Sequence, residues 1–165
     1  MEILGIDIGG SGIKGALVDV ETGIMTTERH RIPTPQPATP EAVTSTVAEV
    51  VKFFRWEGAT GCGFPAVVKN EVALTAANID KSWIGTNVAE MINSKTGCPT
   101  HVSNDVDAAG WAEMNFGAGK GVKGVVLILA LGTGIGSSVF VEGRQVPNTE
   151  LGHIMMHGDI AEKYA

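Results

Sequence analysis

The sequence has 165 residues, 44% of them apolar, which is enough to bury a core and is near the common size of one domain. Its formal net charge of −6 at pH 7 argues against broad binding to nucleic acid, because such binding depends on Lys and Arg neutralising phosphates. Apolar runs all fall short of the roughly 18 residues that a membrane span needs, and the N-terminus lacks a signal-peptide pattern. We therefore expect a cytoplasmic protein that binds neither nucleic acid nor membranes.

The chain opens with a predicted glycine-containing β-hairpin. An apolar run at residues 3–8 predicts a buried strand, Gly9-Gly10-Ser11-Gly12 follows as a loop, and apolar residues resume at 13–18 as a second strand. A turn at Glu21-Thr22-Gly23 leads to a third predicted strand at 25–32. These elements predict a strand meander.

A helix is signalled after the proline-rich segment 33–40, whose four prolines exclude regular structure. Thr39 can cap this helix, and Pro40 suits its first position. The helix should cover one side of the sheet, because its apolar residues share a face: Val43, Val47, Val50, Val51 and Phe54. The later pattern first predicts a strand at 60–64, strand pairing within 67–74, a helix at 87–95 and a strand at 100–103. It then predicts a helix at 105–116 and a second hairpin with strands at 122–131 and 137–141.

The first loop requires a choice between a nucleotide-binding turn and a phosphate-binding hairpin. Gly10-x-Gly12-x-x-Gly15 matches the dinucleotide fingerprint, but a Rossmann loop opens a helix, whereas residues 13–19 continue as a strand. Glycines in a hairpin permit positive φ and let backbone N–H groups approach an anion. A tight turn and a phosphate cradle explain the loop alone equally well.

Two further features favour the phosphate cradle. Asp7 ends the strand before the loop, where a carboxylate can hold a hydrated Mg²⁺ ion, and Lys14 can meet a phosphate oxygen. The segment 132–136 repeats the strand and glycine-loop design. The predicted phosphate-binding residues are Gly9, Gly10, Ser11, Gly12, Lys14, Gly132, Thr133 and Gly134.

Four motifs, in this order and spacing, resemble the ROK family of sugar kinases: residues 7–14, Asn104-Asp105, Leu131-Gly132-Thr133-Gly134 and Glu150-Leu151-Gly152-His153. Segments 34–40, 76–87 and 147–150 look like the branch of that family that phosphorylates glucose with polyphosphate. The resemblance runs along nearly the whole chain. It implies an α/β fold of the actin-like, ribonuclease-H-like type, with an N-terminal lobe at 1–108 and the first part of a C-terminal lobe at 109–165.

The resemblance also implies roles for single residues. Asp105 matches the general base, which takes the proton of the sugar 6-hydroxyl as the phosphoryl group arrives. From the residue alone, a helix N-cap is the other interpretation of Asp105, and both roles can coexist. The implied sugar ligands are Asn78, Asn104, Asp105, Glu150 and His153. Taken singly, the two asparagines can also be interpreted as ordinary turn residues and the histidine as a structural residue.

Many members of this family hold zinc with the matching histidine and a downstream cysteine cluster. No cysteine follows His153, and Cys62 and Cys98 lack the spacing of a zinc site or a disulfide framework. We expect no zinc site and two buried thiols. Trp83 and Trp111 are expected to pack in the core, with stacking on a sugar as the alternative.

The implied reaction transfers a phosphoryl group from inorganic polyphosphate to glucose with Mg²⁺ as cofactor. An ATP-dependent glucokinase stays an alternative, because the glycine loops recognise phosphates of either donor. A sugar-binding transcriptional regulator is a third interpretation. It is disfavoured because the first predicted strand begins at residue 3, which leaves no room for the helix-turn-helix that such regulators carry ahead of it. Family kinases continue well beyond the Glu-x-Gly-His motif, so we expect a truncated second lobe, and a homodimer.

Overall fold

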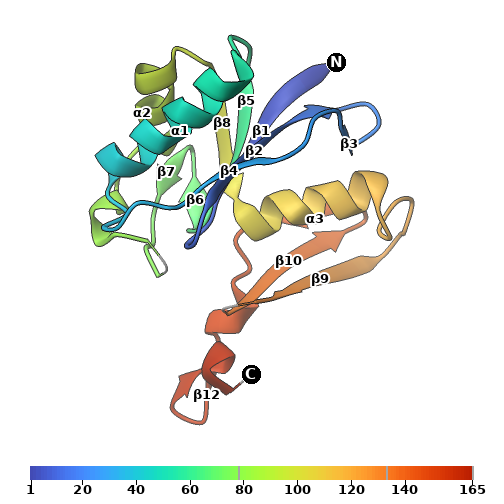
Figure 1. The fold of residues 1–165 in the computed structure, drawn as a ribbon. Helices are drawn as coiled ribbons and strands as arrows, with labels where there is room; N and C mark the ends of the chain where they lie inside the picture. The colour runs from blue at the N-terminus through green and yellow to red at the C-terminus, as the bar shows by residue number, and fades with distance from the viewer. Residues whose placement is uncertain (78, 133, 165) are drawn as a thin grey trace. The chain divides into compact units, whose positions relative to one another are not determined.

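The computed structural model of the chain describes residues 1–77, 79–132 and 134–164. The chain divides into two compact units, an N-terminal unit at Met1–Asp105 and a C-terminal unit at Val106–Ala165. Each unit is described by itself (Figure 1).

The N-terminal unit is built on a six-stranded sheet of order β3-β2-β1-β5-β8, in which β4 also pairs with β2. The hairpin of β1 (Glu2–Ile8) and β2 (Ile13–Asp19) is antiparallel. By contrast, β5 (Thr60–Phe64) pairs in parallel with both β1 and β8 (Thr100–Asn104). The predicted hairpin and the predicted strands at 60–64 and 100–103 are therefore confirmed, and the structure adds that the latter two run parallel.

The single strand expected at 25–32 is wrong, since the structure has two short strands, β3 (Ile24–Met25) and β4 (His30–Ile32). Both pair with β2. Between them, the backbone N–H of Thr26 still donates to the carbonyl of Leu17 at 2.8 Å, but the backbone N–H of Leu17 donates to Oγ1 of Thr27 at 3.0 Å. Such side-chain bonds compete with regular pairing and interrupt the strand.

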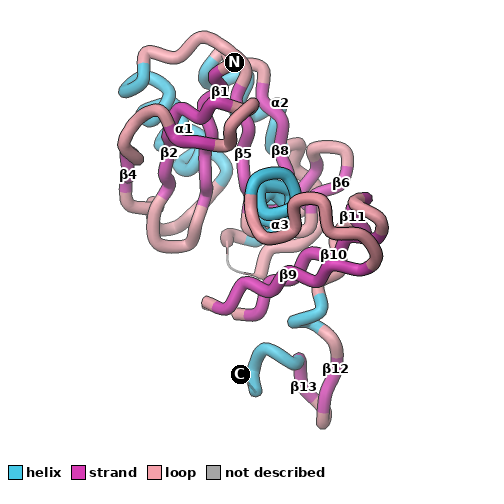
Figure 2. The backbone as a smooth tube through the Cα atoms, turned by 90° about the vertical axis from the view of Figure 1, so that its right-hand side faces the viewer, coloured by secondary structure: helices cyan, strands magenta, loops and turns pink. Residues whose placement is uncertain are grey.

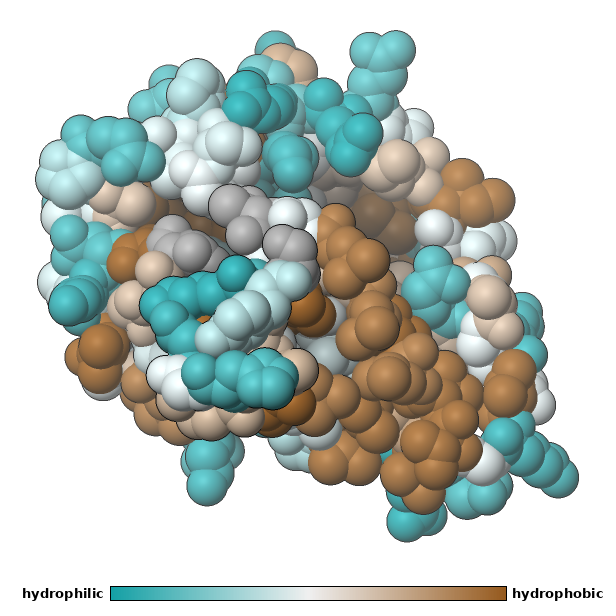
Figure 3. Space-filling view, turned by 90° about the horizontal axis from the view of Figure 1, so that it is seen from below, coloured by the Kyte–Doolittle hydropathy of each residue, from teal (hydrophilic) through white to brown (hydrophobic). Residues whose placement is uncertain are grey.

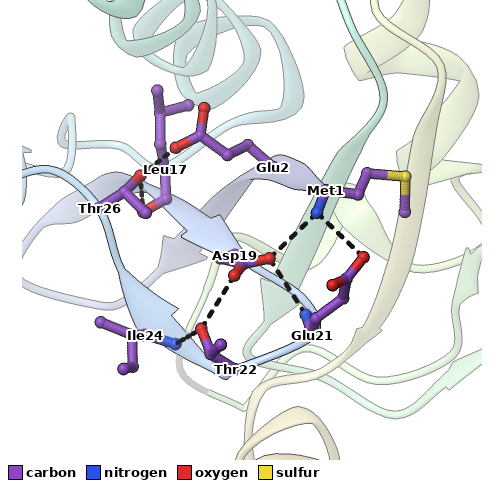
Figure 4. Close-up of polar contacts among 8 residues, drawn as sticks. All are labelled: Met1, Glu2, Leu17, Asp19, Glu21, Thr22, Ile24 and Thr26. Carbon is purple, nitrogen blue, oxygen red and sulfur yellow. Dashed lines mark hydrogen bonds and ion pairs between the residues drawn. The ribbon is translucent and has the colours of Figure 1, made fainter.

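The turn after β2 is organised by Asp19 (Figure 4). Its carboxylate accepts hydrogen bonds from the N-terminal ammonium of Met1 at 3.1 Å, the backbone N–H of Glu21 at 3.2 Å and the hydroxyl of Thr22 at 3.1 Å. These donors, the ammonium first, lower the pKa of Asp19. Gly23 has a φ of 71°, which a glycine adopts without strain. The predicted turn is confirmed.

Two helices cover one face of this sheet, α1 (Pro40–Phe54) and α2 (Val88–Thr96) (Figures 1 and 2). Thr39 caps α1 by accepting from the backbone N–H of Ala42, and Asn87 caps α2 by accepting from Glu90, so both helices begin where side-chain caps predict. The buried residues of α1 include Val43, Val47, Val50 and Val51. The expected apolar face of α1 is confirmed.

The rest of the N-terminal unit closes the core around Trp83. This residue ends η1 (Lys81–Trp83), is fully buried, donates from Nε1 to the carbonyl of Ala38 at 3.0 Å and packs edge-on against Phe64. The small hairpin of β6 (Val68–Lys69) and β7 (Val72–Ala73) confirms the pairing expected within 67–74. No helix in the described ranges is long and apolar enough to cross a membrane.

The C-terminal unit packs α3 (Asp105–Phe116) on a three-stranded sheet. Its strands are β9 (Val125–Leu131), β10 (Ile135–Val141) and β11 (Arg144–Val146). Gly110 of α3 faces Phe140 so closely that a Cβ would lie 2.9 Å from its ring. Short elements follow: η2 (Leu151–His153), β12 (Met155–Met156), β13 (Asp159–Ile160) and η3 (Ala161–Tyr164).

The prediction that Trp111 packs in the core is wrong. Its side chain is 44% exposed, meets Phe140 edge-on at 5.4 Å and donates from Nε1 to Oε1 of Gln145 at 2.8 Å. The neighbouring Gly110 faces Ser138 and Phe140 on β10, whereas Trp111, one position on in the helix, meets the sheet only with one edge of its side chain.

One face of β9 is apolar and exposed. The residues concerned alternate along the strand and are Val125, Leu127, Leu129 and Leu131. A broad hydrophobic area is visible on the surface of the molecule (Figure 3). A strand that is apolar on both faces is typical of a sheet covered on both sides, so this face is suited to contact with further polypeptide.

The packing of α1 on β2 depends on Gly15, where a Cβ would lie 2.5 Å from Cγ1 of Val50. Gly15→Ala is therefore expected to lower the free energy of unfolding by about 1–3 kcal/mol through overpacking. Urea denaturation followed by circular dichroism measures this change. The matched control is Gly61→Ala on β5, where an added Cβ meets nothing within 4 Å.

A double variant separates overpacking from a backbone effect. Val50→Ala in the Gly15→Ala background should recover part of the loss, because it removes the methyl group that the new Cβ meets. Equal stabilities of the Gly15→Ala and Gly61→Ala variants would contradict this account of the packing.

Candidate active site

The candidate site lies where the parallel strands of the N-terminal unit end. Asp7 on β1 pairs with Gly63 on β5, which pairs with Ser103 on β8. Since neighbouring strands lie about 4.8 Å apart, β1 and β8 are about 10 Å apart at this edge. The first glycine loop follows β1 and Asp105 follows β8, so both lie at the same edge of the sheet.

Asp105 is positioned by Gly63. A Cβ on Gly63 would lie 3.4 Å from Cα of Asp105, which brings the start of α3 directly beside β5. The neighbouring Asn104 is buried, and its amide donates from Nδ2 to the carbonyl of Ala66 at 3.1 Å. This bond ties the turn after β5 to the end of β8 and fixes the backbone that carries Asp105. The predicted sugar ligand Asn78 lies outside the described residues.

The first glycine loop is a closed hairpin tip. The backbone N–H of Gly9 donates to the carbonyl of Gly12 at 3.1 Å, and the hydroxyl of Thr34 donates to the carbonyl of Gly9. Among the residues that the structure describes, the backbone N–H groups of Gly10, Ser11 and Gly12 have no hydrogen-bond acceptor. Three adjacent donors at one tip are suited to an anion.

Of the two reasons expected for the loop glycines, positive φ is wrong at Gly9 and Gly12, because neither residue adopts it. Gly12 instead lies close against an arginine side chain. A Cβ at this position would overlap Nε of Arg31, whose guanidinium lies against the loop and donates from Nη2 to the carbonyl of Ser11. Sequence reasoning missed Arg31, since only the register of β4 against β2 brings it to the loop.

Asp7 and Lys14 form an ion pair at the base of this loop. Nζ of Lys14 lies 2.9 Å from Oδ2 of Asp7, and both side chains are partly exposed. The predicted metal ligand and the predicted phosphate ligand are thus brought together. No group of three or more His, Cys, Asp or Glu that could hold a metal ion occurs in the described part of the chain.

A pocket of about 220 Å³ adjoins the first loop. Gly9 and Gly10 form one wall, the proline-rich segment contributes Thr34 and Gln36, and Asp80 lies on another side. Segments 34–40 and 76–87, which the sequence singled out separately, therefore meet beside the loop.

The C-terminal unit holds the second loop and the predicted pair Glu150 and His153. Within the loop, the backbone N–H of Gly132 donates to the carbonyl of Gly134 at 3.0 Å, while Thr133 lies outside the described residues. Oε2 of Glu150 lies 3.4 Å from Nδ1 of His153, so the i, i+3 pair meets as the spacing predicts.

Glu162 was missed by sequence reasoning. Its Oε1 lies 3.6 Å from Nε2 of His153, while its Oε2 accepts from the backbone N–H of Ile135 at 3.3 Å and faces Gly134. His153 thus lies between two carboxylates. No short sequence spacing links Glu162 to the motif at residues 150–153. Its position beside His153 therefore becomes visible only in the folded chain.

A buried network holds the Glu150 segment on the sheet. Oδ1 of the buried Asp107 accepts from the hydroxyl of Ser138 at 3.0 Å, and its Oδ2 accepts from the backbone N–H of Asn148 at 3.3 Å. The hydroxyl of Ser137 accepts from the backbone N–H of Leu151 at 2.9 Å. Sequence reasoning did not single out Asp107. The signal that could have found it is its spacing of three residues from Gly110, which places its carboxylate on the same side of α3 as that glycine.

The two cysteines are buried free thiols, as expected. Burial raises the pKa of the Cys62 thiol, so it stays protonated and inert at neutral pH.

Comparisons with known proteins identify the family and the fold. The family model described as ROK family matches residues 3–163. The chain is 52% identical over 162 residues to the polyphosphate glucokinase of Mycobacterium tuberculosis (strain CDC 1551 / Oshkosh), covering 98% of this chain and 61% of that relative. The chain therefore spans about three fifths of the length of this curated relative.

Solved structures match as well. An inorganic polyphosphate/ATP-glucomannokinase from Arthrobacter sp. strain KM has a TM-score of 0.96 at 47% identity, covering 99% of this chain and 68% of that one. A ROK family glucokinase from Streptomyces griseus, in complex with glucose and AMPPNP, has a TM-score of 0.85 at 29% identity. This match covers 100% of this chain and 57% of that one. The expected α/β sugar-kinase fold is confirmed by these likenesses. Because the family model matches almost the whole sequence, the chain belongs to the ROK family.

Proposed function

We propose that this chain carries the phosphate-loop and general-base half of a sugar kinase that transfers a phosphoryl group from inorganic polyphosphate to the 6-hydroxyl of glucose. One observation supports this most: the donor-rich loop at Gly10, Ser11 and Gly12 and the carboxylate residue Asp105 lie at one edge of one sheet. An anionic donor and an alcohol acceptor need such groups side by side.

In the proposed reaction, Asp105 accepts the proton of the sugar 6-hydroxyl as that oxygen attacks the terminal phosphorus. The P–O bond to the rest of the donor breaks, and the leaving oxygen departs with the shortened chain. The backbone N–H groups of the first loop stabilise charge on the moving phosphoryl group. Exclusion of water matters, because hydrolysis of the donor competes with transfer.

The sugar ligands are proposed from family resemblance together with their placement. Asn104 uses its amide to hold the turn at Ala66, which supports a role in orienting Asp105. Glu150 and His153 meet in one turn, and a carboxylate can accept from two sugar hydroxyls at once. The roles of Asn78, Thr133, Gly132 and Gly134, like the homodimer, remain predictions.

Kinases of this kind typically use a divalent metal, and the residues at the first loop fit Mg²⁺. Mg²⁺ keeps several waters and is bound through one or two carboxylates plus substrate phosphates, so the single partly exposed carboxylate of Asp7 suffices as a water-mediated ligand. When bound, Mg²⁺ would offset negative charge on the donor phosphates. Lys14 would then turn from Asp7 toward a phosphate oxygen.

Polyphosphate is the proposed donor and ATP the second candidate. The names of the relatives support both, since the Mycobacterium protein is a polyphosphate glucokinase and the Arthrobacter protein a polyphosphate/ATP-glucomannokinase. The segments 34–40 and 76–87, which resemble the polyphosphate branch, line the pocket beside the first loop and favour polyphosphate.

Asp105→Asn is expected to lower the rate of glucose 6-phosphate formation by about 10²–10⁴-fold, because the amide keeps the shape but cannot accept the proton. Glucose binding, measured by calorimetry, should change far less. The matched control is Asp19→Asn, at the opposite edge of the same sheet, with an unchanged rate expected. An undiminished rate in the Asp105→Asn variant would refute the assignment.

Donor choice gives a second prediction. Under equal Mg²⁺ and glucose, kcat/KM with long-chain polyphosphate should exceed kcat/KM with ATP, because the pocket beside the loop carries the polyphosphate-branch segments. A higher kcat/KM with ATP would contradict polyphosphate as the preferred donor and would make ATP the donor instead. The proposed role of Asp105 would be unaffected by that result.

A further inference from the structure

The N-terminal unit places two cations directly opposite each other on neighbouring strands. Lys14 on β2 pairs with Arg31 on β4, and Lys14 pairs on its other side with Asp7 on β1. Directly paired residues of antiparallel strands point to the same face, with Cβ atoms about 5 Å apart. The three side chains therefore form a row at the base of the first loop.

This row is only partly neutralised. Asp7 lies 2.9 Å from Nζ of Lys14 and offsets that charge. Arg31 instead donates to the carbonyl of Ser11, a neutral acceptor, and is exposed. Like charges directly opposite each other destabilise a sheet, so the pairing of these two cations is unfavourable for the fold. A local conflict of this kind is typical of a functional position.

Arg31 is also held in a defined place. Its guanidinium lies so close to Gly12 that a Cβ there would force it to move, and its bond to Ser11 uses one of five N–H donors. The remaining donors lie beside the tip formed by Gly10, Ser11 and Gly12, whose backbone N–H groups have no acceptor among the described residues. A guanidinium next to such a tip can bind phosphate through charge-assisted hydrogen bonds.

We infer that Arg31 binds the anionic donor, extending the first loop into a cationic row that receives the phosphate units next to the transferred one. The inference rests on the proposed function and adds a donor-binding residue to it. In a chain whose net charge is −6, a confined cation of this kind is what a polyanion needs. Arg31 is exposed and already lies beside the loop through its bond to Ser11, so a donor can reach it there.

The test measures binding of inorganic tripolyphosphate and of long-chain polyphosphate to the purified chain by calorimetry at several salt concentrations. Arg31→Gln keeps an amide that can donate to Ser11 but removes the charge, and it should weaken binding about 10-fold to 100-fold. The slope of log K against log salt should become shallower by about 0.7, as for one lost phosphate contact on a flexible polyanion. Arg31→Lys keeps the charge and should retain most of the affinity.

The matched control is Arg55→Gln, which removes one positive charge from the same unit at the C-terminus of α1, beyond the far edge of the sheet. Its affinity and salt slope should equal those of the unchanged chain. Polyphosphate binding that survives Arg31→Gln but fails in Arg31→Lys would make Arg31 a brace for the loop and overturn the inference alone. Absence of polyphosphate binding by the unchanged chain would overturn the proposed donor as well.

Discussion

The candidate site depends on the parallel hydrogen bonding of β5 to β1 and β8. Parallel strands end at the same edge, so the loop after β1 and the residue after β8 come together although they are separated by more than ninety positions in the sequence. Gly63 on the strand between them has no side chain, and Asp105 occupies the space beside it. The sheet thus sets the distance between the proposed anion-binding tip and a carboxylate without a loop having to span it.

Around this edge, small residues and short polar bonds keep the backbone in place. Gly12 leaves room for Arg31, Thr34 ties the proline-rich segment to Gly9, and Asn104 ties the turn at Ala66 to β8. In the C-terminal unit, Asp107 does the same for the segment that carries Glu150. The residues proposed to meet the substrates are in this way held in place by contacts and hydrogen bonds with their neighbours.

Local patterns predicted most elements because caps and apolar periodicity determine them: Thr39 and Pro40 start α1, Asn87 starts α2, and the alternating run at 60–64 is β5. Local patterns failed where distant segments decide. The threonine side chains after β3 interrupt a strand, and Trp111 stays partly exposed at the side of the contact between α3 and its sheet. Arg31 and Glu162 reach their loops only through the fold, and the sequence carries no spacing that links them.

The central claim is that an anionic donor binds to the main-chain amides of the first loop. Two-dimensional ¹H–¹⁵N NMR spectra recorded during titration with tripolyphosphate test it directly. The account predicts that the amide resonances of Gly10, Ser11 and Gly12 move most, while those of α2 stay in place. The largest shifts at Lys95 of α2, with the loop amides unchanged, would contradict it.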